Sequence, residues 1–169
     1  MCLRFFSRAA IVMLAILIAD GAKRANAETI GHSMLRTCPN RAALASANQR
    51  ATAADAANDP DRYALHRAVA RELDQCSRTN ADPRYREVAT LASIATMLGS
   101  LNLRSMKNVS DLKDRAGKVR GWEKTASDLA VTTRYPDVRG AATMLRTSLA
   151  AMLSKMDAEI ARLEPGKKP

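Results

Sequence analysis

The stretch VATLASIATMLGSLNL (Val88–Leu103) contains no charged side chain, although 26% of the residues in the chain are charged. A helix that is apolar or small on every side is normally buried, either at the centre of its own fold or inside a partner. We therefore expect Val88–Leu103 to be the central helix of this protein. An interface between copies of the chain in a homo-oligomer is the alternative.

Two helices are expected before this stretch. Asn40–Ala57 is rich in alanine, has Leu44 as its only large apolar residue, and is predicted to be helical by propensity more than by periodicity. Asn58-Asp59-Pro60 then breaks the chain. Asp59 is expected to cap a second helix that starts at Pro60 and runs to about Ser77. Asp82-Pro83 repeats this start signal before the uncharged stretch.

Two longer helices are expected after it, joined by a short link at Tyr135-Pro136. We expect Ser110 to cap the first, Asp111–Arg134, whose apolar positions are Leu112, Ala116, Val119, Trp122, Ala126 and Leu129. The second carries an apolar stripe with spacings of three, four or seven residues, made of Val138, Leu145, Leu149, Met152, Met156, Ile160 and Leu163.

The expected fold is therefore an all-α bundle of about five helices. Two antiparallel helical hairpins pack around the central uncharged helix, because short links between long helices favour antiparallel neighbours. After Cys38, no segment alternates apolar and polar residues for long enough to predict a strand.

Cys38 and Cys76 are predicted to form a disulfide bond. Cys38 lies about 20 residues before the turn at Asn58-Asp59 and Cys76 about 18 residues after it, so an antiparallel hairpin brings both to its open end. Closing such a loop contributes ~4 kcal/mol in the chain-entropy model, which would hold down a helix with few large apolar residues. A redox or metal site is the competing interpretation, but neither a C-x-x-C motif nor a second ligand cluster accompanies the cysteines.

The N-terminus predicts export. Arg4 and Arg8 precede the apolar run AIVMLAILIA (residues 10–19), which is shorter than a membrane span and is followed by Ala25-Asn26-Ala27. We therefore divide the chain into a signal peptide (residues 1–27), one helical domain (28–163) and a disordered tail (164–169). Cleavage after Gly21 and a retained membrane anchor are the alternatives. The mature chain keeps a net charge of about +7.

The sequence offers no recognisable catalytic or metal motif, so no cofactor and no metal are expected. His32 and His66 lie far apart and form no metal-ligand spacing with acids. Capping explains the acidic cluster at the first turn better than a calcium loop does, because Pro60 interrupts it and no glycine and distal glutamate complete the pattern. The cluster consists of Asp55, Asp59 and Asp61. Met152 and Met156 fit core packing better than copper binding.

One helix face stands out as a candidate partner-binding surface. Gly117 and Gly121 leave backbone accessible on the side of Asp111–Arg134 that lies away from the apolar stripe. Three cations at helical spacing accompany them: Lys113, Arg120 and Lys124. Such a row complements an acidic surface, although an ordinary solvated face has a similar composition.

These observations favour an exported, non-enzymatic helical binding protein, such as an inhibitor, an adaptor or a chaperone-like factor in the periplasm or outside the cell. Its expected partner is a protein or an anionic envelope component, because basic surfaces attract acidic ones and an exported protein rarely meets nucleic acid. A membrane-surface protein and an enzyme without a familiar motif are the alternatives.

We predict cleavage of the exported protein after Ala27, which leaves Glu28 as its first residue. The intact mass of the protein recovered from outside the cytoplasm tests this. A mass that starts at Ala22 moves the cleavage site to Gly21, and a mass that retains residues 1–27 contradicts the export prediction.

Overall fold

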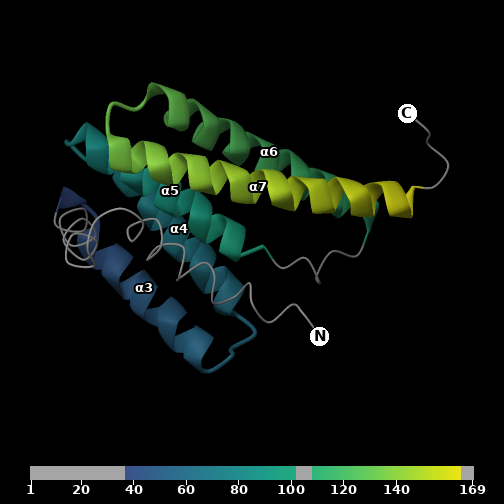
Figure 1. Cartoon of the computed structure of the whole chain (residues 1–169). Coiled ribbons are helices and arrows are strands. Elements are labelled where there is room, and N and C mark those ends of the chain that lie inside the picture. The colour runs from purple at the N-terminus through teal and green to yellow at the C-terminus, as the bar shows by residue number, and fades with distance from the viewer. Residues whose placement is uncertain (1–36, 102–107, 165–169) are drawn as a thin grey trace.

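The computed structural model describes residues 37–101 and 108–164, and all of its regular elements are α-helices (Figure 1). They are α3 (Arg41–Ala56), α4 (Arg62–Thr79), α5 (Pro83–Gly99), α6 (Val109–Thr132) and α7 (Pro136–Leu163). The prediction of an all-α bundle of five helices is confirmed for this part of the chain. The predicted signal peptide, His32 and residues 165–169 of the predicted tail lie outside the described residues.

Helix α5 is central, as the absence of charge predicts. Leu91, Ile94 and Ala95 belong to a core cluster with α6 and α7. Ala89 and Ala92 belong to a second cluster with α3 and α4. In Figure 1, α6 and α7 lie side by side across one side of α5, whereas α4 separates α5 from α3. All six residues from Leu91 to Thr96 are buried. An oligomer interface through this helix stays a prediction, and these six positions offer it no exposed surface.

The two sides of α5 differ in side-chain size. Ala89 and Ala92 pack in the cluster with α3 and α4. Ala70 of α4 is only 1% exposed, and the Ser93 hydroxyl donates a hydrogen bond of 2.8 Å to the Ala70 carbonyl. Small side chains let two helix backbones approach closely, which explains how a side-chain hydroxyl reaches the backbone of the neighbouring helix. The opposite side of α5 presents Leu91, Ile94 and Ala95 to the cluster with α6 and α7.

The start of α4 differs from the prediction. The helix begins at Arg62, after a turn, and not at Pro60 with Asp59 as its cap. Asn58 adopts a left-handed conformation (φ 51°), and the amides of Asn58 and Asp59 bond back to the carbonyls of Asp55 and Ala54, which ends α3. The Asp59 carboxylate accepts a hydrogen bond from the Asp61 amide (2.7 Å), so it stabilises the turn that contains Pro60.

Three other predicted boundaries also shift. Asn108, not Ser110, caps α6, because its side-chain oxygen accepts a hydrogen bond of 2.8 Å from the Asp111 amide. Helix α6 ends at Thr132, two residues before the predicted Arg134, and α5 ends at Gly99, not at Leu103. The start at Pro83 is confirmed, since the Asp82 carboxylate accepts a hydrogen bond from the Arg84 amide (2.8 Å).

The second hairpin packs through the predicted stripes. On α7, Val138, Leu145, Leu149 and Met156 are buried, whereas Met152 and Ile160 are partly buried. Leu163, which the stripe also includes, is 42% exposed at the last turn of the helix. The N-terminal ends of α5 and α7 are tied by an ion pair between Arg84 and Asp137 (2.8 Å). The hydrogen bond that Arg84 donates to Asp137 raises the pKa of the guanidinium, which opposes the effect of its partial burial.

Helix α3 packs mainly on α4 and is fastened to it at both ends. At the open end, the sulfur atoms of Cys38 and Cys76 lie at disulfide distance, with 5.2 Å between their Cα atoms. Next to them, the Asn40 amide donates to the backbone carbonyl and to the carboxylate of Glu72, each at 2.8 Å. At the turn end, His66 contacts Asp55 at 2.9 Å. Between these ends the buried α3 side chains are one leucine and alanines: Leu44, Ala47, Ala51 and Ala54.

We predict that replacing Cys38 and Cys76 together by alanine lowers the melting temperature by roughly 10–20 °C, because the unfolded chain regains the freedom of a loop of 38 residues. Alanine is preferred to serine here, since both cysteines are at most 2% exposed and a hydroxyl would be buried. Thermal unfolding followed by circular dichroism measures the change.

Hydrogen exchange supplies the internal control for this variant. Amide protection should fall in α3 and α4 and remain in α6 and α7, which form their own core cluster with α5. A variant that melts with the parent protein would show that the disulfide does not hold α3 in place.

Candidate functional site

The predicted partner-binding face lies on the exposed side of α6. Gly117 and Gly121 are exposed, and a methyl group added at either would meet no atom within 4 Å. Lys113, Arg120 and Lys124 follow the glycines along the same side of the helix at spacings of seven and four residues. The structure therefore places the five predicted residues on one face of α6, with open space where the side chains of the two glycines would be.

Each of the three cations on this face already has a carboxylate partner. Lys113 pairs with Glu164 (2.9 Å), just after the end of α7, and Arg120 pairs with Asp157 of α7 (2.6 Å). Lys124 pairs with Asp128 within α6 (3.2 Å). Two of these pairs run along the seam between α6 and α7. The row therefore presents much less unmatched positive charge than its sequence suggests.

The structure contains a second candidate site, a pocket where α4, α5 and α6 meet. Its volume is about 220 Å³. Residues of three helices line it: Asp74 from α4, Thr90, Ser93, Ile94 and Met97 from α5, and Trp122 and Thr125 from α6. The central helix forms most of the lining because both α4 and α6 pack against it.

The pocket lining mixes polar and apolar side chains, and the protons of its hydroxyl groups are used within the chain. The Ser93 hydroxyl donates its hydrogen bond to the Ala70 carbonyl, and the Thr90 hydroxyl donates to the Arg86 carbonyl (3.0 Å). The Thr125 hydroxyl donates to the Gly121 carbonyl (3.1 Å). With these protons already used, the lining offers hydroxyl oxygens and the Asp74 carboxylate as acceptors beside the apolar side chains Ile94, Met97 and Trp122. An apolar group can enter against these three side chains.

The sequence did not predict the pocket, although it contained one indication of it. Trp122 is the only tryptophan in the chain, and it sits at the edge of the α6 stripe, where it is only partly buried. A large aromatic residue at the border of an apolar stripe packs with one side and leaves the other accessible. The residues opposite it belong to α4 and α5, and their approach depends on how the helices pack.

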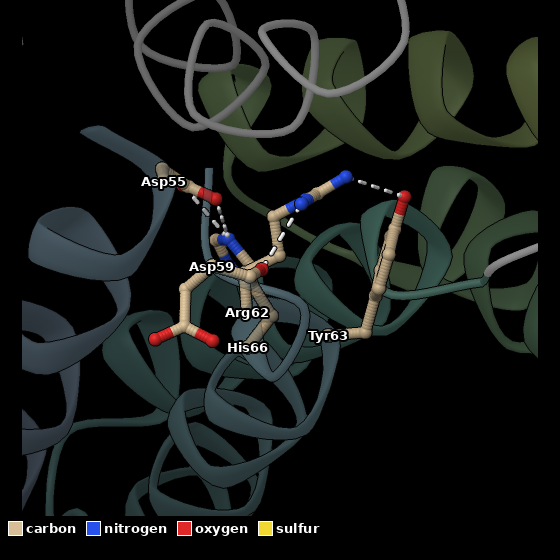
Figure 2. A network of polar contacts seen from close by, with 5 residues as sticks. All are labelled: Asp55, Asp59, Arg62, Tyr63 and His66. Atoms are coloured by element: carbon tan, nitrogen blue, oxygen red, sulfur yellow. Dashed lines mark hydrogen bonds and ion pairs between the residues drawn. The ribbon is translucent and has the colours of Figure 1, made fainter. Parts of the chain in front are cut away.

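His66 and Asp55 form a polar pair that the sequence did not predict. The imidazole Nε2 lies 3.0 and 2.9 Å from the two carboxylate oxygens of Asp55, and the two side chains are 12% and 16% exposed. Figure 2 shows this pair beside the turn, with Arg62 directed at the Asp59 carbonyl and at the Tyr63 hydroxyl. The acidic cluster is thus used in the turn and in the contact between α3 and α4.

The His66–Asp55 pair lacks a third component for nucleophilic catalysis. In the described ranges, the hydrogen bonds of the imidazole go to Asp55 and to no serine, threonine or cysteine. No group of three or more histidine, cysteine, aspartate or glutamate side chains that could hold a metal ion occurs among residues 37–101 and 108–164. The pair joins α3 and α4 near the turn between them.

Comparison with protein-family models, with curated proteins and with solved structures found no match. The two candidate sites are therefore the basis for a functional proposal.

We predict that replacing Lys113, Arg120 and Lys124 together by glutamine leaves the helical content unchanged and lowers the melting temperature by less than about 5 °C. The reason is that exposed ion pairs contribute little to the free energy of unfolding. Circular dichroism and thermal unfolding measure both quantities. A much larger loss would show that the seam between α6 and α7 depends on these pairs. Retained binding to a partner would remove the row from consideration as a binding face.

Proposed function

We propose that this chain is an exported, non-enzymatic α-helical binding protein, acting as an inhibitor, an adaptor or a chaperone-like factor. In this proposal the pocket beside Trp122 receives an apolar side chain of a protein partner. The observation that carries the proposal is the pocket itself, where side chains of three helices meet, the apolar side chains Ile94, Met97 and Trp122 among them, and the hydroxyl protons are used within the chain.

The small volume of the pocket favours a single side chain over a small molecule or cofactor as its occupant. Sites for small molecules and cofactors usually have volumes of about 300–1000 Å³. The volume here is about 220 Å³, and the pocket is open to solvent. A side chain anchored in such a pocket, with further contacts on the surrounding surface, is the usual arrangement in protein–protein recognition.

The polar groups around the pocket favour binding over catalysis. Asp74 is the one titratable side chain in the lining, and it is half exposed and paired with Arg78 at 2.9 Å. General acid–base catalysis needs a titratable group whose environment adjusts its pKa, commonly beside a second such group. A single exposed, paired carboxylate does not supply this arrangement.

One finding supports the exported location within this proposal. Cysteines at disulfide distance are typical of oxidising compartments, and the predicted signal peptide agrees with this. Among the helices in residues 37–101 and 108–164, none has both the length and the apolar content needed to cross a membrane.

Filling the pocket tests the proposal. We predict that Thr90→Phe abolishes or strongly weakens capture of the partner from an envelope extract by the exported protein, because the ring occupies the space of the anchoring side chain. Thr143→Phe is the matched control. Thr143 is exposed on α7, and its hydroxyl also donates to a carbonyl of its own helix, that of Arg139 (2.9 Å).

A direct measurement accompanies the capture experiment. The purified partner should protect Trp122 of the parent protein from quenching by acrylamide, and it should give no protection in the Thr90→Phe variant. If Thr90→Phe and Thr143→Phe bind the partner equally well while circular dichroism shows both folded, the pocket is not the binding site and the proposal fails.

A further inference from the structure

A second row of cations lies on α4, beside the pocket. Arg67, Arg71, Asp74 and Arg78 succeed one another at spacings of four, three and four residues, and all four are exposed. Residues at these spacings share one side of a helix, with about 5–6 Å between successive Cβ atoms. We call these four residues the arginine row, and the row meets the pocket at Asp74, which belongs to the pocket lining.

The arginine row carries unmatched positive charge. Arg78 pairs with Asp74 (2.9 Å), whereas Arg67 and Arg71 have no ion pair within residues 37–101 and 108–164. This distinguishes the row from the predicted face on α6, where Lys113, Arg120 and Lys124 all have carboxylate partners. Three arginines and one aspartate give the arginine row a net charge of +2 beside the pocket.

Arginine side chains favour one kind of complementary group. The planar guanidinium forms two parallel hydrogen bonds to a carboxylate, so exposed arginines beside a pocket can orient an acidic partner. A peptide segment offers both features in one chain, since an apolar side chain fills the pocket while neighbouring carboxylates reach the arginines.

We infer that the partner of this protein presents an acidic segment with an apolar anchor, whose carboxylates pair with Arg67 and Arg71 while the anchor enters the pocket beside Trp122. This inference rests on the proposed binding function of the pocket and adds the chemistry of the partner. The contacts are exposed, so salt screens them over about 8 Å at physiological ionic strength, and association weakens as salt rises.

The single tryptophan makes the inference directly measurable, because all tryptophan fluorescence of the protein comes from the pocket. Three synthetic peptides of ten residues serve as probes, each with a central leucine flanked by glutamates, by serines or by lysines. We expect the glutamate peptide to bind about tenfold more tightly than the serine peptide, as two exposed ion pairs allow, and the lysine peptide to bind weakest. The advantage of the glutamate peptide should shrink as salt is raised.

Two matched double substitutions test whether the preference for the glutamate peptide depends on the arginine row. Arg67→Gln with Arg71→Gln should weaken binding of the glutamate peptide roughly three- to tenfold and leave binding of the serine peptide unchanged. Arg41→Gln with Arg50→Gln removes the same charge from exposed positions on α3, a helix that contributes no residue to the pocket lining, and should leave both peptides unaffected.

The possible outcomes separate this inference from the proposed function. Binding of the serine or lysine peptide as tight as that of the glutamate peptide overturns the acidic partner. A larger fluorescence change with vesicles of anionic lipid than with the glutamate peptide also overturns it, as does the absence of any change with that peptide. In each case the proposed function still stands if Thr90→Phe loses the captured partner, and it fails if that variant keeps it.

Discussion

The burial of α5 on two sides is the constraint on which the other packing depends. A helix without charge over most of its length must be covered on both sides. It presents Ala89 and Ala92 to the cluster with α3 and α4, and Leu91, Ile94 and Ala95 to the cluster with α6 and α7. The side with alanines permits the close approach that lets the Ser93 hydroxyl bond to the Ala70 carbonyl. The side with Leu91 and Ile94 fills the space that the second hairpin leaves. The same helix supplies most of the pocket lining, so the candidate site is a consequence of how the core is covered.

The first hairpin shows how a helix with little apolar surface is kept in place. The buried side chains of α3 are Leu44 and three alanines, which bury little area compared with a helix rich in leucine. Its contacts with α4 are therefore reinforced at both ends, by Cys38 and Cys76 at one end and by Asp55 and His66 at the other. The cysteines and the acidic cluster, which look like candidates for chemistry in the sequence, are used in fastening this helix.

Two rows of basic residues have different surroundings. The row on α6 faces the acidic residues of α7, and ion pairs at 2.6 and 2.9 Å join the two helices there. The row on α4 has one acidic residue within it, and the pocket lies at its edge. Net charge alone does not distinguish a row that is neutralised within the chain from a row that remains free to attract a partner.

The sequence by itself determined the helical class, the central position of α5 and the pairing of the two cysteines. These features follow from local composition, from periodicity and from the equal lengths of the two legs of a hairpin. It also indicated the start of α5, since Asp82-Pro83 is followed directly by helical residues. At Asp59-Pro60 the same pair failed to mark a helix start, because Asn58 ended α3 in a left-handed conformation and a turn followed. Two nearby residues could likewise cap α6, and Asn108, not Ser110, does so.

Only the tertiary structure decided which charged side chains are paired within the chain and where the pocket lies. The partners of Lys113 and Arg120 are 51 and 37 residues away along the chain, and the walls of the pocket come from three helices. Periodicity assigns a residue to a side of its own helix, but it does not show which side of another helix faces it. That relation depends on the angles and distances at which the helices pack, which are set by the combined volumes of all the buried side chains.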